Sequence, residues 1–165
     1  MHPLQRLAPG AYLVSALLIS VSLVDYLGNA WPFLPGDVSW RYGVVGMIST
    51  FLLSPLLGCL LASAVAAWVP HPPVSRLLGG GMLIVASLLL VALGGFVLDS
   101  LQVRSAAAPE AQWVTTTSFL LASAKILLAA VALIVLAVGN LRAASAAAAN
   151  RPGKGAPIRP IVGQS

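Results

Sequence analysis

The stretch VTTTSFLLASAKILLAAVALIVLAV, residues 114–138, carries one charged side chain, Lys125, in an otherwise uncharged and mostly apolar run. A helix of ~20 such residues is long enough to cross the ~30 Å hydrocarbon core of a bilayer. A lone ammonium at that depth costs ~3 kcal/mol or more, and such a residue usually has a partner or a function. The run therefore predicts a membrane-spanning helix and makes Lys125 a candidate site.

Three further apolar runs, Ala11–Leu27, Val44–Val69 and Leu77–Leu98, have similar lengths. Of the 165 residues, 59% are hydrophobic and 8% are charged, against roughly 25% charged in a soluble domain. Membrane β-strands would instead show alternating segments of ~10 residues. We predict an all-α fold, an integral membrane four-helix bundle over residues 1–145, with helices near 9–27, 43–69, 76–99 and 113–141.

The distribution of basic residues predicts the topology. Placing both termini in the cytoplasm puts six basic residues inside and two outside, as the positive-inside rule requires. The final segment, 146–165, is expected to be a disordered basic cytoplasmic tail that rests on anionic lipid rather than binding nucleic acid. Residues 22–25 offer no good small-x-small cleavage site, so the first run is expected to be an uncleaved helix. The expected location is the inner (cytoplasmic) membrane.

The first loop is rich in aromatic residues and proline. Its rings are of the kind favoured at headgroup depth, and two prolines restrict its backbone. We predict a short, ordered hairpin on the outer surface that serves as an aromatic belt anchor or as a recognition surface. The interface candidates are Trp31, Phe33, Trp40, Arg41 and Tyr42.

The second run carries small residues at three- and four-residue steps, which let helices approach closely in lipid. Pro55 lies among them and should kink the helix because it lacks a backbone donor. We interpret this face as a packing surface, and a gating hinge at Pro55 is the alternative. The packing candidates are Gly46, Ser54, Pro55, Gly58 and Ala62.

Small and polar residues also form a stripe in the fourth run. The stripe consists of Thr115, Ser118, Ala122, Lys125 and Ala129. We expect it to face the bundle, so that Lys125 pairs with Asp25 or Asp99 near the outer side. The pair would either lock the helices together or couple a proton or substrate. A lysine that snorkels toward the surface without a partner is the remaining alternative.

Several function classes are excluded by what the chain lacks. Its one cysteine, Cys59, cannot form an internal disulfide, and its histidines, His2 and His71, fall outside the apolar runs. No metalloprotease, nucleophile-elbow or phosphate-loop motif occurs. We predict a non-enzyme with no cofactor and no metal site.

Pro32-Phe33, Trp40-Arg41-Tyr-Gly43 and Ser54-Pro55-Leu-Leu-Gly58 follow one another within residues 32–58. This order resembles the HpsJ-like membrane proteins of bacteria, which are associated by name with hormogonium polysaccharide secretion. The resemblance implies an accessory membrane protein of exopolysaccharide export, without assigned catalytic residues.

The sequence thus favours an accessory or scaffold subunit that acts through helix–helix and outer-loop contacts. Its expected partners are the lipid bilayer and other membrane proteins or further copies of the chain. The alternative is a small oligomeric transporter or channel subunit that uses Lys125 with Asp25 or Asp99.

Overall fold

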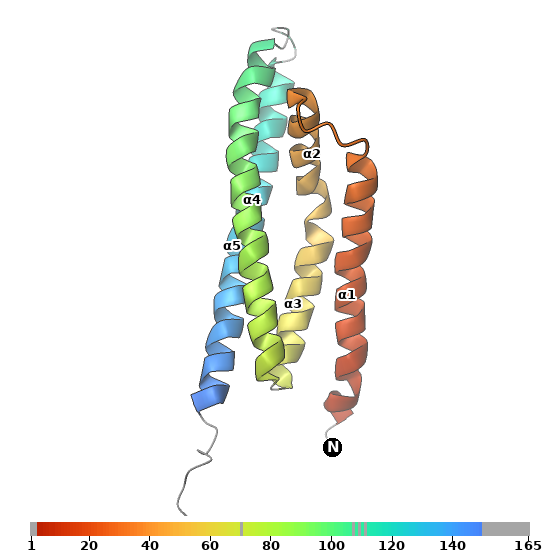
Figure 1. The fold of residues 1–165 in the computed structure, drawn as a ribbon, viewed down its shortest axis with the longest axis vertical. Helices are drawn as coiled ribbons and strands as arrows, with labels where there is room; N and C mark the ends of the chain where they lie inside the picture. Colours follow the sequence, from red (N-terminus) through yellow and green to blue (C-terminus); the bar gives the residue numbers. More distant parts are fainter. Residues whose placement is uncertain (1–2, 70, 107, 109, 111, 150–165) are drawn as a thin grey trace, which may run out of the picture.

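The computed structural model describes residues 3–69, 71–106, 108, 110 and 112–149. The described residues form five α-helices and no strand, which confirms the all-α prediction (Figure 1). The helices are α1 Pro3–Ala30, α2 Val38–Phe51, α3 Leu53–Trp68, α4 Pro72–Ala106 and α5 Gln112–Ala149.

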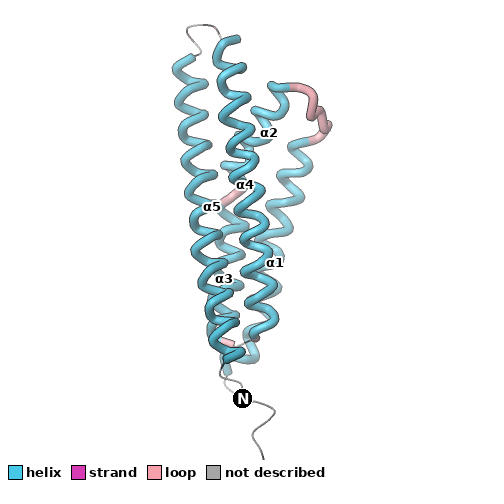
Figure 2. The backbone as a smooth tube through the Cα atoms, turned by 60° about the vertical axis from the view of Figure 1, so that its left-hand side comes forward, coloured by secondary structure: helices cyan, strands magenta, loops and turns pink. Residues whose placement is uncertain are grey.

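The five helices make four roughly parallel rods, because α2 and α3 follow one another along a single bent rod (Figures 1 and 2). The start of α1 and the end of α5 lie at the same end of the molecule, here called the terminal end. The loop of residues 31–37 between α1 and α2 lies toward the opposite end, here called the loop end (Figure 2). This arrangement places the two described chain ends on one side of the molecule.

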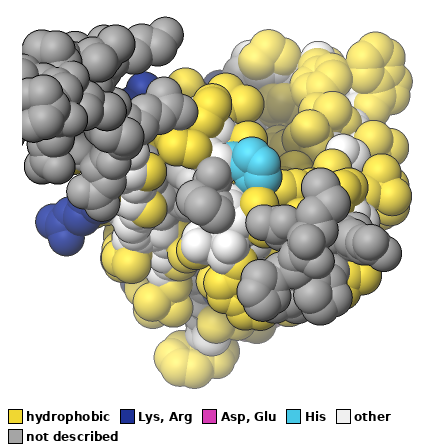
Figure 3. All heavy atoms as spheres, turned by 90° about the horizontal axis from the view of Figure 1, so that it is seen from below, with side chains coloured by type: hydrophobic (Ala, Val, Ile, Leu, Met, Phe, Trp, Pro, Cys, Tyr) yellow, Lys and Arg dark blue, Asp and Glu magenta, His cyan; other side chains and the backbone are white. Residues whose placement is uncertain are grey.

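Three helical segments are long and apolar enough to cross a membrane: Leu7–Ala30, Pro72–Ser105 and Gln112–Ala149. The bent pair α2–α3 makes a fourth if it counts as one span. Large hydrophobic side chains remain exposed along the rods, among them Val24, Leu77 and Val91 at 67%, 78% and 74%. Hydrophobic side chains also occupy much of the visible rim when the molecule is viewed from the terminal end (Figure 3). Such a surface is suited to lipid rather than water.

The second rod differs from the single helix predicted over 43–69, since it bends by 46° where α2 ends and α3 begins. Pro55 is the third residue of α3, within the first turn, where backbone N–H groups have no partner inside the helix. A proline is therefore tolerated there, and its ring prevents α2 from continuing unbroken through this point. The rod also starts earlier than predicted, because the Asp37 carboxylate accepts a 2.8 Å bond from the backbone N–H of Ser39 and caps α2.

α5 extends to Ala149, so the first four residues of the predicted tail, 146–149, are helical. Alanine has the highest helix propensity, which favours this extension of the alanine-rich segment. The remainder of that predicted tail, residues 150–165, lies outside the described residues.

The main core lies between α4 and α5. Its buried members recur at three- and four-residue steps along each helix. They include Met82, Ala86 and Leu89 on α4 and Ile126, Ala130, Leu133 and Ala137 on α5. Within the described part of the chain, α1 contacts only α2 and α3 and has no contact with α4 or α5. The bent rod therefore stands between α1 on one side and the α4–α5 pair on the other.

Candidate functional site

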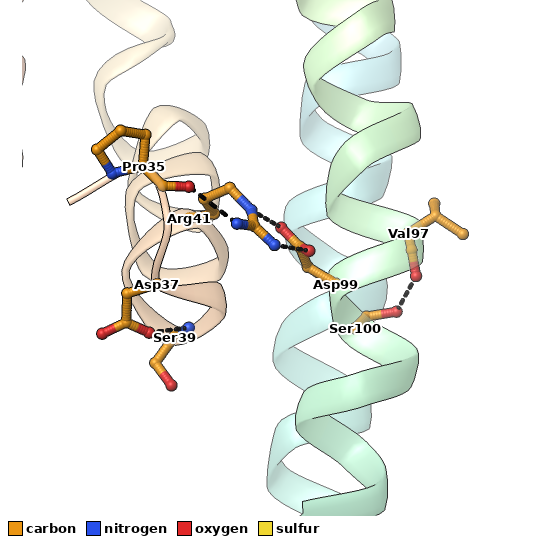
Figure 4. Close-up of polar contacts among 7 residues, drawn as sticks. All are labelled: Pro35, Asp37, Ser39, Arg41, Val97, Asp99 and Ser100. Carbon is orange, nitrogen blue, oxygen red and sulfur yellow. Dashed lines mark hydrogen bonds and ion pairs between the residues drawn. The ribbon is translucent and has the colours of Figure 1, made fainter.

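Arg41 joins three segments at the loop end (Figure 4). Its guanidinium donates from Nε to Oδ2 of Asp99, at 3.0 Å, and from Nη2 to Oδ1, at 2.9 Å. The remaining nitrogen, Nη1, donates to the backbone carbonyl of Pro35 at 2.9 Å. One side chain on α2 thus holds both the α1–α2 loop and α4, in the paired geometry that makes arginine–carboxylate bonds strong.

This pair corrects the prediction that Asp99 is the partner of Lys125. The Asp99 side chain is 10% exposed and both of its oxygens bind Arg41. Arg41 lies near the start of α2, and Asp99 lies near the end of α4, so both belong to the loop end. Lys125 is thirteen residues into α5, ~20 Å along the helix from its start, and is too deep to compete.

Three aromatic rings cluster between the loop and the first turn of α2. Trp31 and Phe33 meet edge to face at 5.6 Å between ring centroids, and Phe33 meets Trp40 at 5.9 Å. The Trp40 indole N–H donates to the carbonyl of Ala30, at the end of α1, at 3.2 Å. Trp31 is 71% exposed and Phe33 is 50% exposed. The loop therefore presents two rings to the surroundings, while the Trp40 ring ties the start of α2 to the end of α1.

Tyr42, the remaining predicted interface residue, points inward instead. Its ring stacks on Phe96 of α4 at 4.8 Å, and Phe96 packs in turn against Phe119 of α5 at 5.2 Å. Phe96 is 1% exposed. Tyr42 is thus a packing residue beneath the loop and not part of its exposed surface.

The predicted packing residues divide between two faces. On α3, the hydroxyl of Ser54 donates to the carbonyl of Leu18 on α1, at 3.0 Å. A methyl group added at Gly58 would lie 2.8 Å from the carbonyl oxygen of Ser15, so the two helices touch there backbone to backbone. Ala62 is buried on the same helix, and Gly46 on α2 faces the ring of Phe96.

Lys125 is exposed, although the predicted stripe was expected to face the bundle. Ala122 and Ala129 of that stripe are buried, and the buried side chain between them is Ile126. Successive residues on a helix are rotated by 100°, so Lys125 lies at the edge of the core face. There it lines two adjoining open pockets, of about 350 and 530 Å³, between α5 and the bent rod.

Asp25 is also exposed, on α1, and it forms no ion pair with Lys125. The helix that carries Asp25 has no contact with α5 within the described residues. A pair of these two side chains inside one copy of the chain is therefore absent from the described structure, as the separation of α1 from α5 requires.

Asn140 is a polar residue whose role the sequence analysis missed. It is 7% exposed, and its amide donates to the Ser63 hydroxyl on α3 at 2.9 Å and to the Leu136 carbonyl at 2.9 Å. The sequence does indicate that Asn140 needs a partner, because an amide just after the apolar run 114–138 must be satisfied if its helix continues. The sequence does not identify that partner, since Ser63 is one of several small polar residues in the second run.

No metal-binding cluster of three or more His, Cys, Asp or Glu side chains occurs in the part of the chain that the structure describes. No protein-family model, curated protein or solved structure matches this chain.

Proposed function

We propose that this chain is a multi-pass membrane protein with both termini in the cytoplasm, and that it is a non-catalytic accessory subunit. Its working surface is the outer loop, where Trp31 and Phe33 meet another membrane protein. The observation that carries this proposal is that Arg41 binds both Asp99 on α4 and the carbonyl of Pro35, in the loop that carries the exposed rings.

Rigid support favours docking over simple anchoring. A ring that only rests at headgroup depth gains from its amphipathic character and needs no fixed backbone. A recognition surface gains affinity when its side chains are already ordered, because less conformational entropy is lost on binding. Aromatic residues are also the side chains that contribute most at the centre of protein interfaces.

The process is inferred from the resemblance to HpsJ-like proteins. The residues that carry it include Pro32-Phe33 and Trp40-Arg41, which in the structure belong to the loop and its support. We infer an accessory role in exopolysaccharide export at a bacterial inner membrane. The loop end would then face outward, toward the extracytoplasmic parts of its partners.

The test is affinity capture of the tagged full-length chain from its native membrane in mild detergent. Wild type should recover a defined set of membrane proteins, and Trp31→Ala with Phe33→Ala should lose most of it. Trp68→Ala is the matched control, because Trp68 is 73% exposed at the end of α3, toward the terminal end. Equal recovery by the wild type and the loop variant would contradict the proposal, as would a chain absent from the membrane fraction.

A further inference from the structure

A groove beside Lys125 carries polar side chains within a largely apolar surface. Its walls carry the hydroxyls of Ser49 and Thr50 from α2 and of Ser118 from α5, around the exposed lysine. The Ser49 hydroxyl already donates to the carbonyl of Gly46 at 2.8 Å. Lys125 makes no hydrogen bond or ion pair with any described residue. The ammonium thus lies in an open groove to which the described residues of its own copy supply no acidic partner.

A carboxylate with the opposite charge to Lys125 lies on the far side of the same molecule. Asp25 is exposed on α1, whose outer face touches neither α4 nor α5 within the described residues. No hydrogen bond or ion pair to its carboxylate is found among the described residues, and its backbone carbonyl accepts from the Asn29 amide at 2.8 Å. Each of the two surfaces therefore offers one charge of opposite sign.

The two charges lie at similar depths along the rods. α1 runs antiparallel to the bent rod, with Ala30 beside Trp40 and Leu18 beside Ser54. Measured from the loop end, Asp25 lies five residues beyond Ala30 along α1. Thr50, which lines the groove with Lys125, lies ten residues beyond Trp40 along α2. At the rise of an α-helix, the depths of Asp25 and Thr50 differ by ~8 Å.

Side-chain direction narrows this difference. Side chains lean toward the N-terminus of their own helix. Lys125 therefore leans toward the loop end, because α5 begins there, and Asp25 leans the other way (Figure 1).

We propose that this groove binds the α1 helix of a second copy of the chain, with Asp25 of one copy paired to Lys125 of the next. Copies inserted in the same direction are related by a rotation about the membrane normal, which leaves depth unchanged. The two charges can then meet where their side chains reach the same depth from the two helices. In lipid, pairing removes an uncompensated charge from each surface, which is a strong reason for association.

This inference rests on the membrane topology of the proposed function but not on the outer loop. The test uses cysteine cross-linking in native membranes, in a Cys59→Ser background so that no native thiol competes. Copies carrying Asp25→Cys are co-expressed with differently tagged copies carrying Lys125→Cys. A cross-linked dimer that contains both tags is expected, whereas either variant expressed alone should stay uncross-linked.

Ala124→Cys is the matched control, because Ala124 is exposed next to Lys125 but does not line the groove. It should not cross-link with Asp25→Cys. In detergent, Lys125→Asp or Asp25→Lys alone should weaken self-association by about tenfold, in line with interhelical polar contacts in membranes. The double reversal should restore it, which a purely structural role of either residue would not.

A monomeric wild type, or an oligomer without the 25–125 cross-link, overturns the inference. Acidic lipid that co-purifies with the wild type and is lost in Lys125→Met, without self-association, assigns the groove to lipid and overturns it as well. A chain found in membranes that fails these tests leaves the proposed function standing. A chain absent from the membrane fraction removes both.

Discussion

The α4–α5 pair and the α1–α3 pair are both antiparallel helix pairs, but they are held together differently. α4 and α5 interlock through side chains of mixed size along most of their length, with Ile126 and Leu133 completely or almost completely buried. α1 meets α3 through small residues, and at Gly58 their backbones are in contact. The first pair resembles a conventional core, and the second is a narrow seam with lipid-suited side chains outside it.

The difference shows where each pair is vulnerable. A broad core distributes its packing energy over many side chains, so one change is partly absorbed. A backbone contact has no side chain that can move aside. Gly58 is therefore the most sensitive point of the α1–α3 seam.

The largest effect is expected from Gly58→Val. The new Cβ would lie 2.8 Å from the Ser15 carbonyl oxygen and 2.9 Å from Cγ1 of Ile19, so α1 must move away from α3. We expect a loss of about 3 kcal/mol in the free energy of unfolding, at the upper end for overpacked sites. A denaturant titration in mixed micelles measures it.

Gly80→Val is the control for that measurement, because a methyl group at Gly80 on α4 meets no atom within 4 Å. It should change stability little. Equal losses in the two variants would show that the cost comes from replacing a helical glycine and not from the seam.

Sequence patterns predicted the helical rods because each apolar run has the length and composition of a spanning helix. They also pointed to Gly58, since small residues four apart are a local pattern that needs no knowledge of the partner helix. The break before Pro55 was anticipated only as a kink. Whether a proline bends a helix or starts a new one depends on how the neighbouring helices pack, and this packing cannot be read from the sequence.

The pairing of charges could not be predicted in the same way. Lys125 and Ile126 are adjacent, yet 100° of rotation separates an exposed ammonium from a fully buried side chain. Depth along the helix was readable from the sequence, and rotation about its axis was not. Arg41 was noted as a loop residue, but its bond to Asp99 joins positions 58 residues apart.

A second prediction concerns the bonds between Arg41 and Asp99, which join α2 to α4 at the loop end. Arg41→Met leaves Asp99 without its two charge-assisted bonds and frees the carbonyl of Pro35. We expect lower thermal stability and greater quencher access to Trp40, whose indole bonds to Ala30 across the same loop. Fluorescence quenching and thermal melting in detergent measure the two effects.

The double variant Arg41→Met with Asp99→Leu distinguishes the support that Arg41 gives to the loop from its pairing with the charge of Asp99. It removes the stranded carboxylate, so stability should recover in part. The loop should remain loose, because Pro35 still lacks its donor. Full recovery of the loop's protection from quencher would contradict the assignment of Arg41 as its support.

The smallest effect is expected for the hydrogen bond between Asn140 on α5 and Ser63 on α3, toward the terminal end. Interhelical hydrogen bonds in membranes are worth about 0.6 kcal/mol on average, so Asn140→Leu should reduce the free energy of unfolding by roughly that amount. Ser63→Ala should cost a similar amount, and the double variant should cost less than the sum of the two because both lose the same bond. Strict additivity would show that Asn140 acts through its 2.9 Å bond to Leu136 on its own helix, leaving packing alone to hold α3 against α5 at this end.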